Sequence, residues 1–581
     1  MKTGCSSFPA VPEYLAAAFY VPGHTQNRKD QRDKMKKGDI AEGIIERVEY
    51  PNKGFIFSGD EKIIVKNGIP GQKVRFQINK KRSGKMEGRL LEVLEPSPLE
   101  TRAPLCEEFP ACGGCMYQTM PYEAQCRMKE EQIFRLLSEV PGLDMNEVQW
   151  EGLLPSPREF HYRNKMEFSF GDACKGGPLT LGLHKKGSTY DVLTTTDCVL
   201  VHPDLNRILE CVYTYFSDKD IPYYHKMTHE GVLRHLLLRR GNTTGEILVH
   251  LVTTSQVPID LTNLVQKLLA LSLEGRIVGI LHVINDSLSD TVRSDETRIL
   301  WGTDHYYETL LGLSFRISSF SFFQPNSYAA EVLYSKVREY VGDTKDMNVF
   351  DLYSGTGTIA QLAAAVAKEV TGVEIVEEAV QAAQANAARN GLTNCRFIAA
   401  DVLRFLEETD QKPDLIILDP PRDGIHPKAL PKIIDFGVER IVYISCKATS
   451  LARDLPEFLK AGYRVEKACC VDQFCQTVHV ETVCLLSQRK PDTTIEVDLD
   501  ISELEVSSAE TKATYEEIKS YVLKKFGLKV SNLYIAQVKR ECGIVERINY
   551  NLPKTEGNRV PQCPEDKRKA IKDAFIHFQM I

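Results

Sequence analysis

The sequence has no long hydrophobic run and no excess of positive charge. No stretch approaches the roughly 20 uninterrupted apolar residues that a membrane-spanning helix needs. Pro12 and Glu13 interrupt the one apolar run near the N-terminus that could resemble a signal peptide. We therefore expect a soluble, cytoplasmic protein. With 72 Lys and Arg against 79 Asp and Glu in 581 residues, the net charge is −7, so any basic surface must be local.

The 16 cysteines do not make a disulfide scaffold in so long a chain, and in a reducing compartment clustered cysteines favour metal binding or catalysis. Three of them, Cys106, Cys112 and Cys115, cluster in "LCEEFPACGGCMYQ" with the spacing C-x5-C-x2-C. A fourth ligand must come from elsewhere, and Cys198 and Cys126 are the candidates. Four thiolates suit zinc or an iron–sulfur cluster. The C-x3-C-x2-C spacing of radical S-adenosylmethionine enzymes is absent.

Changes in composition and periodicity divide the chain into six segments. Short β-rich runs separated by Gly, Asn and Pro turns predict a small β-barrel of about five strands in the second of them. In order, the segments are an expected disordered tail (1–35), the β-barrel (36–97), a mixed α+β region that holds the cysteine cluster (98–319), a βα-patterned region (320–489), an acidic linker (490–510) and a basic C-terminal piece (511–581).

In the fourth segment, five apolar runs alternate with helix-like stretches. The runs are "MNVFDLY", "EVTGVEI", "CRFIAAD", "PDLIILDPP" and "RIVYISC". Such alternation predicts an α/β fold with a parallel, doubly wound sheet. Two further runs, "YRVEKACCVDQ" and "TVHVETVCLLS", are close enough in the chain to form an antiparallel pair, which we expect at the edge of the sheet.

A Gly-rich turn follows the first of these strands, in "DLYSGTGTIAQLAAAVA". Gly355 and Gly357 would let the backbone approach a ligand closely. Glu374 ends the next strand, where a carboxylate accepts hydrogen bonds from ribose hydroxyls, and Asp401 follows the third strand similarly. Position 360 is Ala, so the full G-x-G-x-x-G of dinucleotide enzymes is missing. These residues favour S-adenosylmethionine over NAD.

Three side chains that could take part in a reaction follow at the carboxyl edge of the sheet. Asp419 begins "DPPR", a rigid turn that either faces a reacting base or simply ends a strand. Cys446 lies at a strand-to-helix turn beside Lys447, where a lowered pKa would make the thiol a nucleophile, although a buried inert cysteine is the alternative.

Glu481 lies in an apolar strand, where burial would raise its pKa and suit it to proton transfer, unless edge solvation prevents this. A cysteine nucleophile, a carboxylate base and a methyl-donor site together fit methylation of a pyrimidine at C5. That carbon becomes nucleophilic only after a thiolate adds to C6.

With these motifs in order, the chain resembles the RNA uracil-5-methyltransferase family, and within it the bacterial iron–sulfur members that modify 23S ribosomal RNA. The resemblance covers about residues 36–489 and includes "CEEFPACGGCMYQ", "HYRNKMEFSFG", "SFFQPN", "DLYSGTGTIA", "LDPPR" and "HVETV". It implies an N-terminal TRAM domain, an OB-like RNA-binding barrel, over 36–97. It also implies a central domain with a [4Fe–4S] cluster over 98–319 and a Rossmann-like catalytic domain over 320–489.

Carried over by position, the resemblance implies Cys446 as nucleophile and Glu481 as base. The family usually has Asn-Pro after the nucleophile, whereas Lys447 and Ala448 follow it here. The implied cluster ligands are Cys106, Cys112, Cys115 and Cys198, and the implied contacts to S-adenosylmethionine are Gln324, Tyr353, Thr358, Glu374, Asp401 and Asp419.

We expect a monomer that acts on 23S ribosomal RNA and has no membrane partner. Three alternatives stay open. A transfer-RNA uracil-5-methyltransferase would use identical chemistry, and an amino-methyltransferase could use the Asp-Pro-Pro turn but would not need Cys446. A non-catalytic iron–sulfur RNA-binding protein would leave Cys446 and Glu481 without a role.

The resemblance does not extend past about residue 510. "TYEEIKSYVLKKFG" reads as a helix ended by Gly527, and "SNLYIAQVKREC" as a second helix with Ser531 as N-cap. The pair predicts a helix-turn-helix-like unit that either contacts phosphates or packs as a solvated helical pair. Its basic side would comprise Lys524, Lys525, Lys529, Lys539 and Arg540.

Overall fold

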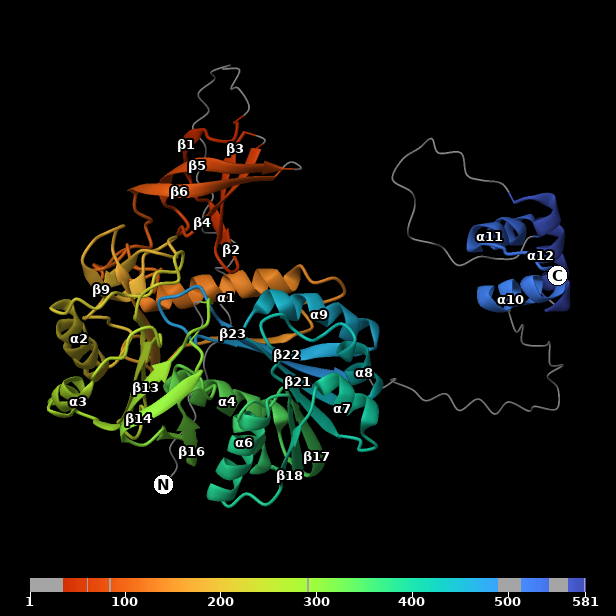
Figure 1. Ribbon diagram of the computed structural model, residues 1–581. Helices are drawn as coiled ribbons and strands as arrows, with labels where there is room; N and C mark the ends of the chain where they lie inside the picture. The colour runs from red at the N-terminus through yellow and green to blue at the C-terminus, as the bar shows by residue number, and fades with distance from the viewer. Residues whose placement is uncertain are drawn as a thin grey trace, which may run out of the picture. The chain divides into compact units, whose positions relative to one another are not determined.

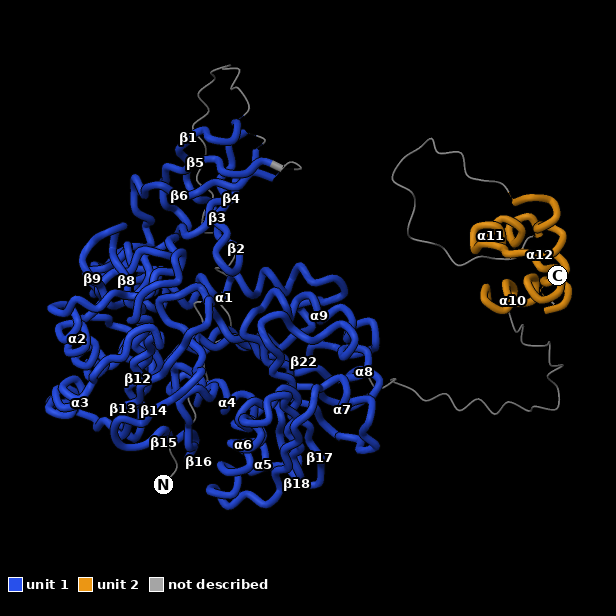
Figure 2. Tube along the Cα trace, viewed as in Figure 1, with its two compact units in different colours: residues 1–490 blue, residues 491–581 orange. Residues whose placement is uncertain are grey.

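The computed structural model forms two compact units, 1–490 and 491–581, each described here by itself (Figures 1 and 2). The acidic linker expected over 490–510 lies outside the described residues, as does the tail expected over 1–35 apart from Met35. The described residues are 35–59, 61–82, 85–289, 292–488, 514–542, 563–578 and 580.

The N-terminal part of the first unit is a six-stranded sheet, one strand more than the sequence predicts. Alternating side chains such as Ile63, Val65, Val74 and Phe76 point to one side and form a small hydrophobic core of their own. The strand order is β1-β5-β6-β4-β3-β2. The strands are β1 (Ile40–Ile44), β2 (Arg47–Glu49), β3 (Lys53–Ser58), β4 (Glu61–Lys66), β5 (Lys73–Arg82) and β6 (Lys85–Glu95).

A seven-stranded sheet occupies the central region, in the order β10-β9-β8-β11-β12-β13-β14. Every residue of β11 and β12 is buried, as expected for strands covered on both faces. The elements are β8 (Lys165–Asp172), β9 (Leu179–His184), β10 (Val192–Thr194), α2 (Pro203–Ser217), β11 (Leu233–Arg240), β12 (Glu246–Thr253), α3 (Thr262–Leu269), β13 (Arg276–Ile284) and β14 (Glu296–Gly302), followed by the hairpin β15 (His305–Leu310) and β16 (Leu313–Ser318).

The third sheet has eight strands in the order β19-β18-β17-β20-β21-β23-β22-β7. The five runs predicted from the sequence are parallel neighbours, and β23 is antiparallel to both of its neighbours. This confirms the predicted α/β fold. The strands are β7 (Gln149–Leu154), β17 (Thr344–Leu352), β18 (Ala367–Glu374), β19 (Cys395–Ala399), β20 (Leu415–Leu418), β21 (Arg440–Ser445), β22 (Tyr463–Val471) and β23 (Glu481–Gln488).

The prediction that the antiparallel pair forms the edge of this sheet is wrong. Strand β7, from outside the βα region, pairs in parallel with β22 and is the outermost strand. Pairing with β7 gives the backbone of β22 a partner on both sides. This explains why Cys469 and Cys470 are fully buried there.

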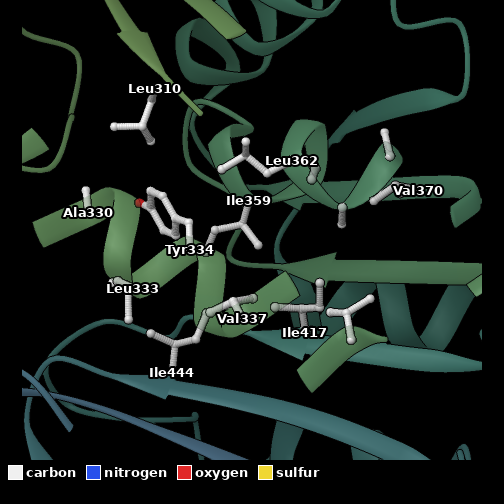
Figure 3. Packing of buried hydrophobic residues seen from close by; sticks show 14 of the residues in the cluster. Leu310, Ala330, Leu333, Tyr334, Val337, Ile359, Leu362, Val370, Ile417 and Ile444 are labelled. Atoms are coloured by element: carbon white, nitrogen blue, oxygen red, sulfur yellow. The ribbon is translucent and has the colours of Figure 1, made fainter. Parts of the chain in front are cut away.

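Helices cover both faces of the eight-stranded sheet (Figure 1). On one face, Leu333, Tyr334 and Val337 of α4 pack against Ile417 and Ile444 of the strands (Figure 3). On the other face, α1 lies between the N-terminal sheet and α9 and contacts both β2 and β7. The helices are α1 (Tyr122–Ser138), α4 (Ser327–Val341), α5 (Thr358–Ala364), α6 (Glu377–Arg389), α7 (Val402–Glu408), α8 (Ala429–Asp435) and α9 (Ala448–Lys460).

The second unit has three helices around its own small core: α10 (Tyr515–Phe526), α11 (Asn532–Glu541) and α12 (Glu565–His577). The two helices predicted from the sequence are present, with Gly527 in the left-handed conformation and Ser531 as N-cap. The third helix, α12, packs against both of them. Across both units, none of the described helices is long and apolar enough to cross a membrane.

Candidate active site and cysteine cavity

The Gly-rich turn between β17 and α5 is held in a conformation that requires glycine. Gly357 has φ of 72°, and a Cβ there would lie 2.5 Å from the ring of Phe397. The carboxylate of Glu374 accepts a hydrogen bond of 3.0 Å from the Gly355 amide. Thr358 is the first residue of α5, and Tyr353 precedes the turn with φ of 68°. The turn, Glu374 and Tyr353 therefore form one continuous ligand-facing edge of the sheet.

Asp351, in the same motif, belongs to this edge and was not predicted. It is fully buried, and neither carboxylate oxygen makes a well-formed hydrogen bond within the described chain. Burial and the nearby Asp419 raise its pKa to about 8. Weak hydrogen bonds from the Ala360 amide and the Ser354 side chain offset burial only partly, so a cationic ligand group such as an amino group would stabilise the charged form of Asp351. An acidic residue on an apolar strand before a Gly-rich turn was the signal that could have revealed it.

The other predicted cofactor contacts differ in their surroundings. Asp419 directly follows β20 and is half-buried, and desolvation raises its pKa to about 7. Gln324 is buried, and its side-chain oxygen accepts a hydrogen bond of 3.3 Å from Gln473. Asp401 is exposed and caps α7 by accepting a hydrogen bond of 3.2 Å from the Arg404 amide. One carboxylate oxygen of Asp401 therefore remains for a ligand.

Cys446 lies between β21 and α9, half-buried, as the strand-to-helix pattern predicts. The expected lowering of its pKa is wrong for the free protein. Burial and the carboxyl groups of Glu481 and Asp419 raise the thiol pKa to about 11, and only Arg422 is a nearby cation that opposes them. The thiol is therefore protonated at neutral pH, and it would have to lose its proton before it could react as a nucleophile.

Glu481 is the first residue of β23 and is 3% exposed. Burial and Asp419 raise its pKa to about 8, and Arg422 opposes the shift. The predicted direction is confirmed. Cys446, Asp419 and Glu481 thus come from three adjacent loop or strand ends and influence one another electrostatically. A carboxyl group whose pKa lies near neutrality can accept and release a proton.

Helix α9 holds the Asp-Pro-Pro turn in place. Buried Asp454 accepts hydrogen bonds from the Ile425 amide (3.0 Å) and the Tyr443 hydroxyl (2.8 Å), and Ser450 donates to the Arg422 carbonyl (2.7 Å). Ser450 and Asp454 of the "SLARDL" run make these bonds, so the helix that follows Cys446 also positions the turn of Asp419.

A groove of about 740 Å³ opens beside these residues, lined from the N-terminal sheet, the cysteine loop, β9 and the segment before β23. Among the described residues that line it, none is acidic. We call it the basic groove; its cationic lining comprises Lys53, Lys66, Arg163, Lys185, Lys186 and Arg422, with His184 and His479. Such a lining suits a polyanion.

The three cysteines of the C-x5-C-x2-C motif and a fourth from a distant part of the sequence line one small cavity, the cysteine cavity: Cys106, Cys112, Cys115 and Cys198. Cys126 is not among its lining residues and lies instead on α1 beside Tyr122. Burial and the neighbouring thiols raise the pKa of Cys115 to about 12 and that of Cys198 to about 11.

Within the described residues, no group of three or more His, Cys, Asp or Glu is spaced to hold a single metal ion. A [4Fe–4S] cluster takes one thiolate on each of four irons, so its ligands stand further apart than four thiolates around one zinc. By its chemistry, the donor set of the cysteine cavity fits an iron–sulfur cluster or zinc.

A family model described as tRNA (Uracil-5-)-methyltransferase matches residues 287–489. The chain is 46% identical over 457 residues to a protein of Clostridium tetani named an uncharacterized RNA methyltransferase, covering 78% of this chain and 99% of that protein. A like-named protein of Chlorobaculum tepidum is 35% identical, with 78% and 98% covered. The chain belongs to the RNA uracil-5-methyltransferase family. It is an S-adenosylmethionine-dependent RNA methyltransferase.

A solved structure supports the same conclusion. The tRNA (uracil-54, C5)-methyltransferase of Pyrococcus abyssi, in complex with S-adenosyl-L-homocysteine, aligns with a TM-score of 0.61 and 26% identity. The alignment covers 77% of this chain and all of that one.

One further residue of this RNA methyltransferase reaches the site from outside the catalytic sheet. Tyr50, at the turn between β2 and β3, is buried in the hydrophobic cluster beneath α9. Burial and the charges of Glu481 and Cys446 raise the pKa of its phenol. The N-terminal sheet therefore contributes a wall of the site as well as part of the groove, which no local sequence pattern indicates.

Proposed function

We propose that this RNA methyltransferase methylates C5 of a specific uridine in 23S ribosomal RNA through a covalent bond between Cys446 and C6 of the base. The observation that carries the proposal is the convergence of Cys446, Asp419 and Glu481 near Arg422, which also lines the basic groove, whose described lining includes no acidic residue. A thiol beside two carboxyl groups of raised pKa suits addition to a pyrimidine followed by proton removal.

In the proposed reaction, Cys446 first loses its proton to solvent water, and its sulfur adds to C6, so the electrons of the C5=C6 bond move towards C5 and O4. Bound S-adenosylmethionine would supply an electrophilic methyl group to C5 and would leave as S-adenosylhomocysteine. Glu481 as carboxylate then takes the C5 proton, and the electron pair left behind reforms C5=C6 and expels the Cys446 thiolate. Asp419 orients the base and the methyl donor. We assign cofactor contacts to Gln324, Tyr353, Thr358, Glu374, Asp401 and Asp419.

The basic groove supports the RNA part of the proposal. A uridine within a folded RNA must leave its stack to bring C6 to a thiol, which costs a few kcal/mol. Lys53, Lys66, Lys185 and Arg422 line the groove, where they would contact phosphates next to the flipped nucleotide. We therefore propose residues 36–97 as a TRAM-type RNA-binding domain, 98–319 as the cluster domain and 320–489 as the catalytic domain of a monomer.

We further propose that Cys106, Cys112, Cys115 and Cys198 bind a [4Fe–4S] cluster. Four thiols buried together in one cavity are consistent with ligation, since burial disfavours their charged form until a cation compensates it. The proposed reaction transfers no electron, so we give the cluster a structural part only.

A transfer RNA substrate is the second candidate, favoured by the similarity to the Pyrococcus abyssi enzyme over most of the chain. The chemistry would be the same and only the RNA would differ. Mass spectrometry of fragments of ribosomal and transfer RNA from a deletion strain decides between them. We expect a 5-methyluridine to be missing from 23S ribosomal RNA, and its loss from transfer RNA instead would favour the second candidate.

The chemical step is tested with ribosomal RNA from the deletion strain labelled with 5-tritiated uridine. We expect Cys446→Ala to reduce tritium release by at least about 10³-fold, because C5 stays unactivated. Glu481→Gln should accumulate a covalent protein–RNA complex on a denaturing gel. Cys211→Ala, at another half-buried cysteine, is the matched control and should behave as the wild type. Substantial tritium release by Cys446→Ala would refute the role of that thiol.

A further inference from the structure

The segment 472–480 links β22 to β23 and therefore ends at Glu481. Val471 and Glu481 are paired in register, so the segment is a closed loop on the end of a hairpin. Phe474 and His479 of this segment line the basic groove. Its conformation consequently determines both one wall of the groove and the position at which Glu481 enters the sheet.

A lysine from a distant helix holds this segment from inside. Lys129 on α1 donates to Asp472 (2.7 Å), to the Phe474 carbonyl (3.2 Å) and to the His479 carbonyl (3.4 Å). An ammonium group has three protons to donate, and here all three acceptors come from one loop. The two charged side chains are 1% and 0% exposed. The contacts therefore join the first part of the segment to its last part.

The same segment is joined to the cysteine loop. The Met116 amide, directly after Cys115, donates to the Gln476 carbonyl at 2.7 Å. The Gln476 side chain donates to Glu159 (2.6 Å) and accepts from Gln125 (3.3 Å). Gln476 has φ of 65°, a conformation that a residue other than glycine keeps only when its surroundings hold it.

Because Lys129 belongs to a buried ion pair, we expect its removal to disturb the segment 472–480. Two charges without solvent contact are held by each other and by their hydrogen bonds, and removal of one leaves the other uncompensated. Loss of Lys129 would leave the buried Asp472 carboxyl group and two backbone carbonyls without this donor. The segment would then rearrange, while the parallel strands that carry the cofactor edge would keep their own hydrogen bonds.

We propose that Lys129 is a positioning residue for Glu481, acting through segment 472–480, which also connects the cysteine loop to the catalytic strand. The inference rests on the proposed function, because it concerns the step in which Glu481 removes the C5 proton. Lys129 contacts no reacting atom. Its loss slows proton removal more than the steps that precede it.

The test separates these steps with two substrates. On ordinary ribosomal RNA from the deletion strain, Lys129→Met should lower the turnover rate by more than about tenfold, with its Kd for S-adenosylmethionine within about twofold of the wild type. It should also accumulate the covalent complex seen with Glu481→Gln. With RNA that contains 5-fluorouridine, which has no C5 proton to lose, Lys129→Met and the wild type should form the covalent complex at similar rates.

A second variant covers the possibility that Lys129→Met does not fold. Gln476→Gly keeps the left-handed backbone conformation and removes the bonds to Glu159 and Gln125, so it should accumulate the complex to a smaller extent. Lys336→Met removes a lysine that pairs with Glu151 at 3.0 Å elsewhere in this unit and is the matched control. It should accumulate no complex.

The outcomes distinguish the two proposals. If Glu481→Gln itself accumulates no complex, the proposed role of Glu481 fails, whatever Lys129 does. If Glu481→Gln accumulates it but Lys129→Met and Gln476→Gly either turn over normally or form the complex slowly on 5-fluorouridine RNA, the positioning role is overturned, because the segment then affects folding or binding instead.

Discussion

The cysteine cavity and the Cys446 site contain the same functional group in two different settings. In both, burial raises the thiol pKa, and Cys198 and Cys446 each reach about 11. The neighbours differ. In the cavity, the titratable groups that influence Cys115 and Cys198 are other thiols, whereas Cys446 is influenced by the carboxyl groups of Glu481 and Asp419, with Arg422 as the opposing cation.

This difference accounts for the two uses of cysteine that we propose for this chain. Thiols that raise each other's pKa stay protonated until a multivalent cation compensates several charges at once, which favours metal ligation. A single thiol beside proton acceptors can lose its proton during a reaction and take it back afterwards. Neighbouring side chains, and not the exposure of the sulfur, thus separate the two roles.

The largest effects are expected when one thiol in each setting is replaced, which tests whether the two cysteine sites act independently. Cys446→Ser should keep the absorption near ~400 nm of anaerobically purified protein and lose methylation by at least about 10³-fold. Cys112→Ser should lose the absorption. Absorption spectra and tritium release measured on the same samples check both. Loss of colour in Cys446→Ser would mean that the two settings are not independent.

The next prediction tests which cysteines belong to the cavity. Cys198→Ser should abolish the brown colour and bound iron, because it removes one of four converging thiols. Cys126→Ser should leave both unchanged, since Cys126 lies beside Tyr122 and outside the cavity lining. Iron and zinc are measured by elemental analysis of protein purified without oxygen. Stoichiometric zinc in place of iron would refute the cluster.

A smaller effect is expected at Arg422, which lowers the pKa of both Cys446 and Glu481. The reaction needs both groups deprotonated, so activity falls as the pH drops through their pKa values. Arg422→Gln raises both values and should move the acidic limb of the kcat/KM profile to higher pH, with a loss of about two- to tenfold at pH 7. The effect is modest because Arg422 is exposed.

The charge-conserving variant Arg422→Lys is the control for this pH profile. It should keep the acidic limb near its wild-type position even if KM for RNA rises. An unshifted limb in Arg422→Gln would show that neither Cys446 nor Glu481 controls the pH dependence.

Patterns local in the sequence predicted most of the catalytic sheet. Buried parallel strands leave continuous apolar runs, so β17 to β21 were recognisable, and the turn residues after them indicated Asp419 and Cys446. Strand β7 was not predicted at the edge, because nothing in "QWEGLL" indicates pairing with a strand more than 300 residues further on. Pairing of that kind follows from tertiary packing.

The pKa of Cys446 is a second property that local sequence patterns did not predict. The sequence displays Lys447 next to the thiol, whereas burial dominates the shift, and the carboxyl groups that add to it belong to Glu481 of β23 and to Asp419, which follows β20. Lys129 and Asp472 are likewise 343 positions apart, and a lysine on a helix normally indicates a solvated face. Sequence patterns therefore could not predict which charged groups the fold brings together.

The smallest effect is expected from the second unit, whose predicted basic side is only partly available. Lys525 pairs with Asp573 at 2.7 Å, and Lys539 is buried over the ring of Tyr515, whereas Lys524, Lys529 and Arg540 are exposed. If these three exposed cations contact phosphates, removal of residues 491–581 should flatten the logarithmic salt dependence of RNA affinity by about 2, at roughly 0.7 per phosphate on single-stranded RNA. Turnover of a short saturating RNA should not change.

Lys524→Gln with Lys529→Gln should reproduce most of the effect in the full chain, and Lys525→Gln, at a paired lysine, should reproduce little of it. An unchanged salt slope in the truncated protein would mean that the unit binds a protein or serves the fold, because phosphate contacts cannot be removed without releasing fewer counterions.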